Sequence, residues 1–178
     1  MMGNFLYSLL FRRLNVVCIG LDGAGKTTVL YSMHKDCQPH TYTMPTVGFN
    51  VEKLTIGGLN INTWDLGGQE QLREYWIHYM RNLDALVYVV DSMDRRRLEQ
   101  SKTELHRILN HPEINRSKAP LAILLNKCDH RDVTKEDLDD VFEVSSFLRT
   151  ARPVEIFETV ANQGKGLQVA FNWLVQHI

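Results

Sequence analysis

The spacing G-x-x-x-x-G-K-[ST] is matched without a gap by Gly20-Leu21-Asp22-Gly23-Ala24-Gly25-Lys26-Thr27. An apolar run, Leu14 to Ile19, precedes these residues and a helix-compatible run, Thr27 to Met33, follows them. The glycines therefore lie at a predicted strand-to-helix turn, where backbone N–H groups and the positive end of the helix can bind phosphate. Lys26 can bridge two phosphates, and the Thr27 hydroxyl can ligate Mg²⁺. The alternative is an ordinary glycine turn with an incidental lysine, which the complete pattern disfavours.

Asp65 ends a predicted strand and is soon followed by two glycines and a glutamine. Its carboxylate can hold Mg²⁺ opposite Thr27, directly or through water. Gly67 and Gly68 allow a backbone N–H to approach a γ-phosphate. The Gln69 amide, with both a donor and an acceptor, is suited to orienting an attacking water. A structural β–α turn is the alternative for this run, but the preceding phosphate loop (Gly20 to Thr27) favours the catalytic interpretation.

The candidate base-binding motif is Asn126-Lys127-Cys128-Asp129. The Asp129 carboxylate can accept two hydrogen bonds at once, and guanine offers two parallel donors, its N1–H and its exocyclic amine. Adenine lacks that pair. The base can lie across the stem of Lys127, while Asn126 can tie the motif to the phosphate loop. Taken alone, these four residues could equally form a solvated turn.

Two further positions carry weaker signals. Thr46 follows Pro45 in a polar segment that we interpret as a mobile loop, and its hydroxyl is a second candidate ligand for Mg²⁺. Taken alone, it is more typical of a plain loop threonine. Thr159-Val160-Ala161 follows the last predicted strand, where the backbone N–H of Ala161 could meet the guanine carbonyl. Neither position indicates a site without the stronger motifs.

The rest of the chain supplies the elements that must position these residues. Alternating runs, Val51 to Ile56 and Leu59 to Asp65, flank Gly57-Gly58 and predict an antiparallel hairpin. Apolar runs from Ala85 to Val90 and from Leu121 to Leu125 predict strands buried on both faces of a parallel sheet. The other predicted elements are a helix with Leu98, Leu105, Ile108 and Leu109 on one face and ended by Pro112, a helix begun by a capping box of Thr134 and Asp137, a strand from Val154 to Val160, and a C-terminal helix with Leu167, Phe171, Leu174 and Ile178 on one stripe.

Strands that alternate with helices after the hairpin predict a doubly wound α/β sheet of about six strands. Ligands of such sheets bind at the carboxyl ends of the strands, where the motifs described above lie. The 178 residues are enough for one domain with its own core. The net charge of −1 gives no electrostatic footprint for nucleic acid. Three cysteines without C-x-x-C spacing suggest neither disulfides nor a zinc site, so we expect a reducing compartment.

Together the motifs resemble those of small GTPases, specifically of the Arf and Arf-like family, over the whole chain. The resemblance is carried by Gly20 to Thr28, Pro45 to Glu52, Trp64 to Gln69 and Asn126 to Asp129. It implies an α/β P-loop NTPase fold with a mostly parallel sheet of about six strands, an antiparallel hairpin between the switch segments and helices on both faces. It also implies a slow GTPase that binds GTP or GDP with Mg²⁺ and cycles between two forms.

The resemblance implies specific roles for residues of this sequence. Gln69 and Lys26 are the expected catalytic residues, and Thr27 and Thr46 the expected Mg²⁺ ligands, with Asp65 acting through water. Phe49, Trp64 and Tyr79 are the expected effector-binding aromatic residues, although composition alone would favour placing them in the core. Contacts to the nucleotide are expected from Asp22, Gly23, Ala24, Gly25, Lys26, Thr27, Thr28, Thr46, Gly68, Asn126, Lys127, Asp129, Val160 and Ala161.

The resemblance further implies a division into residues 1–13, an amphipathic N-terminal segment, and residues 14–178, a GTPase domain. Phe5, Leu6, Leu9 and Leu10 would form the apolar face of a helix that binds membranes reversibly. The expected partners are an exchange factor, an activating protein and effectors, and the expected state is a monomer. We expect a cytoplasmic protein reversibly bound to the cytosolic face of a Golgi or endolysosomal membrane, with a role in vesicular or organelle traffic.

The sequence also departs from the family pattern. The loop from Asp36 to Thr43 is about two residues longer than in typical Arf proteins, by the same resemblance, and Cys128 stands where Gln is usual. Val160 replaces a common Cys, at a position that contributes backbone. Two other functions stay open. Asn126 to Asp129 argues against a P-loop kinase or ATPase. The presence of Lys26, Thr27, Thr46 and Gln69 argues against a nucleotide-locked scaffold without hydrolysis.

Overall fold

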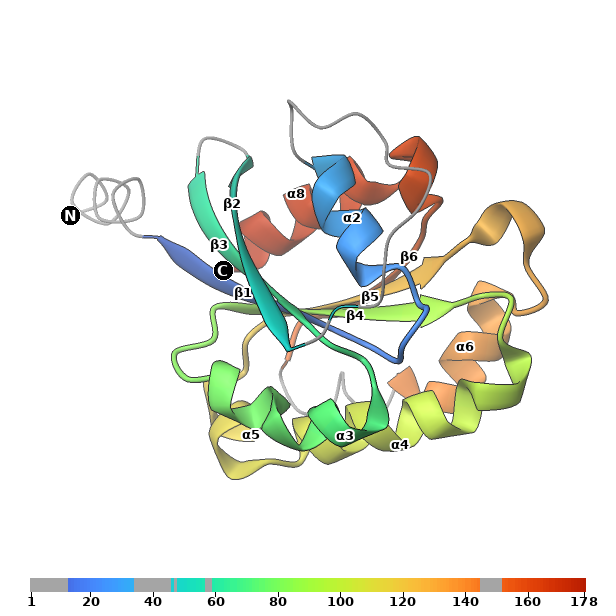
Figure 1. Ribbon diagram of the computed structural model, residues 1–178, viewed down its shortest axis with the longest axis horizontal. Helices are drawn as coiled ribbons and strands as arrows, with labels where there is room; N and C mark the ends of the chain where they lie inside the picture. The colour runs from blue at the N-terminus through green and yellow to red at the C-terminus, as the bar shows by residue number, and fades with distance from the viewer. Residues whose placement is uncertain (1–12, 34–45, 47, 57–58, 145–151) are drawn as a thin grey trace.

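The structure is a computed structural model that describes residues 13–33, 46, 48–56, 59–144 and 152–178 (Figure 1). Its strands are β1 (Leu14–Ile19), β2 (Phe49–Ile56), β3 (Leu59–Leu66), β4 (Ala85–Asp91), β5 (Leu121–Asn126) and β6 (Val154–Glu158). Its α-helices are α2 (Lys26–Met33), α3 (Glu70–Arg73), α4 (Leu98–Leu109), α5 (Pro112–Ser117), α6 (Lys135–Phe142) and α8 (Leu167–His177). Short 3₁₀ helices are η1 (Glu74–Tyr79), η2 (Arg95–Arg97), η3 (Cys128–His130) and η4 (Ala161–Gln163).

The strands form a six-stranded sheet in the order β2-β3-β1-β4-β5-β6. β2 and β3 pair antiparallel, with Phe49 opposite Leu66, and the other neighbours pair parallel. This confirms the predicted mostly parallel sheet with one antiparallel hairpin. The predicted turn at Gly57-Gly58 lies outside the described residues. Because β1, β3, β4, β5 and β6 run parallel, their carboxyl ends meet at one edge of the sheet.

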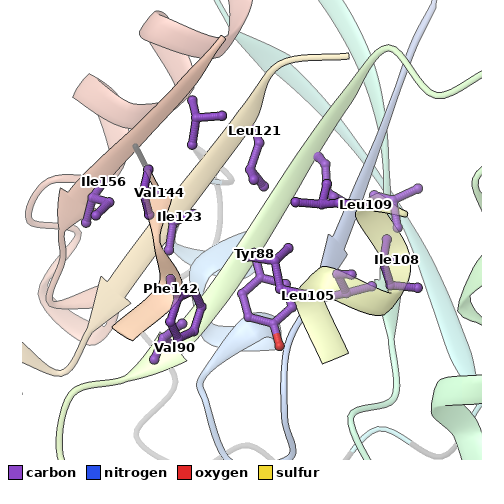
Figure 2. Close-up of a cluster of buried hydrophobic side chains, with 14 of the residues drawn as sticks. Tyr88, Val90, Leu105, Ile108, Leu109, Leu121, Ile123, Phe142, Val144 and Ile156 are labelled. Atoms are coloured by element: carbon purple, nitrogen blue, oxygen red, sulfur yellow. The ribbon is translucent and has the colours of Figure 1, made fainter. Parts of the chain in front are cut away.

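Helices cover both faces of the sheet, as predicted. Figure 1 shows α2 and α8 on one face and α3, α4, α5 and α6 on the other. The core under α4 and α6 includes Tyr88, Leu105 and Phe142 (Figure 2), and the core under α2 and α8 includes Leu30 and Phe171. β4 and β5 are buried along nearly their whole length, which is why their sequences are continuous apolar runs instead of alternating ones.

Most element boundaries lie close to those that the sequence predicts, and two of the differences have a clear physical reason. Pro112 does not simply end the preceding helix, because it also begins α5, where its missing N–H leaves no helical bond unmade. The last strand ends at Glu158 instead of Val160. Val160 and Lys165 exchange two backbone hydrogen bonds of 3.1 and 3.3 Å, which close a loop before α8. The capping box of Thr134 and Asp137 is present at the start of α6, as predicted.

The predicted N-terminal amphipathic helix and the long loop from Asp36 to Thr43 lie outside the described residues. The boundary between residues 1–13 and 14–178 therefore stays a prediction. None of the helices in the described ranges is long and apolar enough to cross a membrane.

Candidate nucleotide-binding site

The phosphate loop joins β1 to α2 at the carboxyl edge of the sheet, as the sequence predicts. Gly25 has a φ of +95°, and a Cβ at this position would lie 2.4 Å from the Asn126 side-chain nitrogen. Only glycine fits there without strain. α2 begins at Lys26, so its first turn, which includes Thr28, presents unbonded backbone N–H groups next to the loop. Loop and helix start together have the geometry that binds phosphate.

The Lys26 ammonium is buried, and it bonds to the loop itself. Its Nζ donates to the carbonyl oxygens of Gly20 at 3.1 Å and Leu21 at 3.0 Å. Burial lowers the pKa of Lys26, and the nearby carboxylates of Asp65 and Asp22 oppose that shift. The Asp22 carboxylate, in the same loop, pairs with Arg73 and Arg97. A buried cation that bonds to neutral carbonyls fits a site that takes an anion.

Thr27, Thr46 and Asp65 come together at the end of β3. Thr27 Oγ1 donates to Asp65 Oδ2 at 2.6 Å, and Thr46 Oγ1 donates to the same oxygen at 3.2 Å. The two hydroxyl oxygens are 3.0 Å apart. Register explains the meeting, because Asp65 pairs with Cys18 just before the phosphate loop. This set of oxygen atoms fits Mg²⁺, which prefers hard oxygen ligands.

Gly67, Gly68 and Gln69 lie against the phosphate loop. The Asp22 N–H donates to the Gly68 carbonyl oxygen at 3.2 Å, and the Gly67 N–H donates to the Gly48 carbonyl oxygen at 2.9 Å. Gln69 precedes α3 in an extended conformation and is half-buried, and its side chain makes no capping bond to the helix. Gln69 thus directly follows the glycine that contacts the phosphate loop, and the helix does not use its amide.

Asn126 joins the base-binding motif to the phosphate loop, as the sequence predicts. Its Nδ2 donates to the Ala24 carbonyl oxygen at 2.9 Å. Lys127 has a left-handed φ of 64°, and its Nζ is 2.6 Å from Asp91 Oδ2. Asp129 lies in η3, and its Oδ2 lies 3.9 Å from His130 Nε2. The Asp129 side chain is 30% exposed, so a ligand can reach its carboxylate.

The segment after β6 differs from the sequence prediction in one contact. The Ala161 N–H, which the sequence assigns to a base carbonyl, donates instead to Asn126 Oδ1 at 3.0 Å. The Thr159 hydroxyl donates to the same oxygen at 3.1 Å. Val160 is buried and its N–H bonds to Lys165. If the Ala161 N–H also donated to a base, it would have to share its hydrogen between the base and Asn126 Oδ1.

Phe49, Trp64 and Tyr79 form an aromatic triad on β2, β3 and η1. Their ring centroids lie 4.9 to 5.8 Å apart. Phe49 is 51% exposed, whereas Trp64 and Tyr79 are half-buried and pack against the core below. The triad is thus neither fully core nor a set of separate surface residues. It is a packed cluster with one open aromatic face, a composition that protein interfaces favour.

Sequence reasoning missed two arginines that bind Asp22. Arg97 Nη1 donates to Asp22 Oδ1 at 3.0 Å, and the buried Arg73 donates to the same oxygen at 3.3 Å. Burial raises the pKa of Asp22, but the charge and hydrogen bonds of Arg97 outweigh it, so the pKa is below its usual value. The contacts span 75 and 51 residues of sequence, and no local pattern predicts them. Asp22, predicted to contact nucleotide, uses its side chain to hold the loop.

Comparisons with known proteins agree with this geometry. The family model of the ADP-ribosylation factor family matches residues 3–178. ADP-ribosylation factor-like protein 1 of Caenorhabditis elegans is 41% identical over 94% of this chain and 90% of its own length. The protein of the same name from Drosophila melanogaster is 40% identical over 92% and 88%.

A solved structure has the same fold. It is the small GTPase Arl6 (BBS3) of Trypanosoma brucei with the bound nucleotide analogue GppNp, which superposes with a TM-score of 0.83 at 31% identity and covers 93% of this chain and 96% of its own. This chain belongs to the ADP-ribosylation factor family, which confirms the predicted small-GTPase fold, the GTP-hydrolysing activity and the use of guanine nucleotides with Mg²⁺.

Proposed function

We propose that this protein is a membrane-recruited switch whose nucleotide state controls effector binding at the triad of Phe49, Trp64 and Tyr79. The carrying observation is the 2.9 Å hydrogen bond from the Gly67 N–H to the Gly48 carbonyl oxygen. It ties the segment that contains Thr46 and Phe49 to the segment that contains Trp64. Both segments also meet at the candidate Mg²⁺ site. A change in the ligands bound at the candidate Mg²⁺ site would therefore move both segments of the triad together.

The site geometry supports the following residue roles. We assign Lys26 to charge stabilisation of the phosphates, because its buried ammonium already lies on the loop. Thr27 and Thr46 supply hydroxyl oxygens to Mg²⁺, with Asp65 behind them. Mg²⁺ would neutralise charge on the phosphates. Gln69 orients the attacking water, and Asp129 reads the base.

The proposed partners are an exchange factor, an activating protein and effectors that bind the open face of the triad. The experiment compares effector capture by the protein loaded with GDP and with a non-hydrolysable GTP analogue. Capture restricted to the analogue-loaded protein, and lost in Tyr79→Ala, supports the proposal. Tyr31→Ala on α2 serves as the control. Equal capture in both nucleotide states would overturn the switch.

The isolated protein is expected to hydrolyse GTP slowly. The sequence from Pro39 to Pro45 contains no arginine that could reach the γ-phosphate. Arg73 and Arg97, which do reach the phosphate loop, are bonded to Asp22. Single-turnover hydrolysis should therefore be near ~10⁻⁴ s⁻¹, not the ~10⁻² s⁻¹ of a GTPase with its own arginine finger. A rate at or above the higher value would show that no activating protein is needed.

Liposome binding is expected to depend on nucleotide and on the N-terminal segment. Four apolar side chains, Phe5, Leu6, Leu9 and Leu10, each contribute at most ~1.5 to 3 kcal/mol and are only partly buried in a membrane interface, which allows reversible binding. Sedimentation with anionic liposomes should show more binding of the GTP-loaded form, weakened by salt and by Phe5→Ala. Ser8→Ala, off the apolar face, is the control.

Two results of that measurement bear on the membrane proposal. Equal sedimentation of the GDP- and GTP-loaded forms would contradict the coupling of membrane binding to nucleotide. If neither form binds, a protein receptor or an acyl chain must supply the attachment. We propose that the protein binds the cytosolic face of a Golgi or endolysosomal membrane and acts in vesicular or organelle traffic. Imaging of the full chain in cells tests that location.

A further inference from the structure

We propose that Trp76 and Arg73 are positioning residues that aim the Gly68 N–H at the γ-phosphate, and that they set the preference of the site for GTP over GDP. The inference rests on the proposed nucleotide switch and concerns how the protein senses the third phosphate. Trp76 lies in η1 and Arg73 at the end of α3, and both side chains are buried.

Gly67 is held on both sides by protein atoms. Its N–H donates to the Gly48 carbonyl oxygen at 2.9 Å. Its carbonyl oxygen accepts a hydrogen bond from Trp76 Nε1, also at 2.9 Å. Trp76 is only 1% exposed, so this indole is fixed by packing and its N–H has a defined direction. A buried indole N–H needs such a partner, and here the partner is a peptide group of the site.

Gly68 is held at its carbonyl. The oxygen accepts hydrogen bonds from Arg73 Nε at 2.9 Å and from the Asp22 N–H at 3.2 Å. The approach to the phosphate loop is so close that a Cβ on Gly68 would lie 2.5 Å from backbone atoms of Gly20, Leu21 and Asp22. Arg73 therefore fixes the second peptide plane at the point where it touches the loop.

Three of the four backbone polar groups of Gly67 and Gly68 thus have protein partners. The fourth is the Gly68 N–H, and no hydrogen bond from it is present within the described part of the chain. In a trans peptide the carbonyl of one residue and the N–H of the next point in opposite directions. The Trp76 bond to the Gly67 carbonyl therefore turns the Gly68 N–H away from the core.

Arg73 is itself locked in place. Its Nη1 lies 3.5 Å from Glu104 Oε1, its Nη2 lies 3.3 Å from Asp22 Oδ1, and its carbonyl oxygen accepts from Arg107 Nη2 at 3.0 Å. The planar fork of a guanidinium makes these contacts at once, which the single ammonium of lysine does not. Arg73 thus holds Gly68 at a fixed separation from the phosphate loop, and this separation sets where the Gly68 N–H would meet a third phosphate.

The test measures the affinity of the full chain for GDP and for a non-hydrolysable GTP analogue, with Mg²⁺ present. Trp76→Phe removes the N–H donor and keeps an aromatic ring, and Arg73→Lys keeps the charge and removes the fork. Each variant should bind the GTP analogue about three- to tenfold more weakly, as expected for the loss of one hydrogen bond, and bind GDP within about twofold of wild type. Trp173→Phe, on α8, should change neither affinity.

Other outcomes separate the explanations. An equal loss of both affinities in both variants would mean that these residues serve only the fold, and it would overturn the inference; so would two unchanged affinities. Thermal unfolding of the GDP-bound forms reports any loss of packing in Trp76→Phe. If Trp76→Phe does not fold, the two nucleotide affinities of Arg73→Lys test the inference alone. If the wild-type chain bound neither guanine nucleotide, the proposed switch would fail as well, a result distinct from any variant effect.

Discussion

Gln69→Leu is expected to slow GTP hydrolysis in the presence of an activating protein by about 10² to 10⁴-fold. Leucine has nearly the same size as glutamine but cannot orient a water molecule, because it lacks the amide. The Gln69 side chain makes no capping bond to α3, so its replacement removes no bond on which that helix depends. Nucleotide affinity should therefore be retained. The measurement is single-turnover release of phosphate from the GTP-loaded protein.

Gln71→Leu is the matched control for that experiment. Gln71 lies in α3, directly after Gln69, and is exposed, so the same chemical change is made two residues away from the proposed catalytic position. The control should hydrolyse GTP at the wild-type rate. If Gln69→Leu also does so with the activating protein present, Gln69 does not orient the water.

Asp129→Asn is expected to change the base preference from guanine toward xanthine. Asparagine offers one acceptor and one donor group where aspartate offers two acceptor oxygens, so a guanine donor loses its partner at a cost of about 1 to 3 kcal/mol. Xanthine has a carbonyl in place of the exocyclic amine and gains relative to guanine. The backbone of the motif should persist, because Cys128 N–H bonds to the Thr159 carbonyl oxygen at 3.1 Å.

Competition between GTP and xanthosine triphosphate measures this change. Asp132→Asn is the control: Asp132 is exposed, and the bond that Arg95 makes to it uses the backbone carbonyl, not the carboxylate. An unchanged affinity of Asp129→Asn for GTP would show that the base is read by another group.

The sequence predicts those parts of the fold whose physical cause is local. β4 and β5 are buried on both faces, so their sequences are continuous apolar runs. The capping box at Thr134 involves two residues only three positions apart. Pro112 misleads because the same residue that stops one helix is well suited to begin the next. The length of the last strand depended on the bond between Val160 and Lys165, which strand propensity does not encode.

Part of the candidate site could also be predicted, because the positions of some of its residues follow from the order of strands and helices. Asp65 and Asn126 lie at strand ends, and Lys26 and Thr27 lie at the start of the helix that follows β1. A parallel sheet brings these positions together at one edge. The bonds from Arg73 to Gly68 and from Trp76 to Gly67 are different, because each joins a side chain to a backbone carbonyl. Every residue has a backbone carbonyl, so no residue type in the sequence identifies which carbonyl will accept the bond.

We expect Asn126 to couple the loops of the candidate site to one another when nucleotide is released. One amide holds three loops: its Nδ2 bonds to the phosphate loop at Ala24, and its Oδ1 accepts from Thr159 and Ala161 beyond β6. A protein that displaced any one of these loops would withdraw a bond from the shared amide and loosen the other two. An exchange factor that displaced the phosphate loop would thereby also weaken binding of the base, without contacting the base-binding residues.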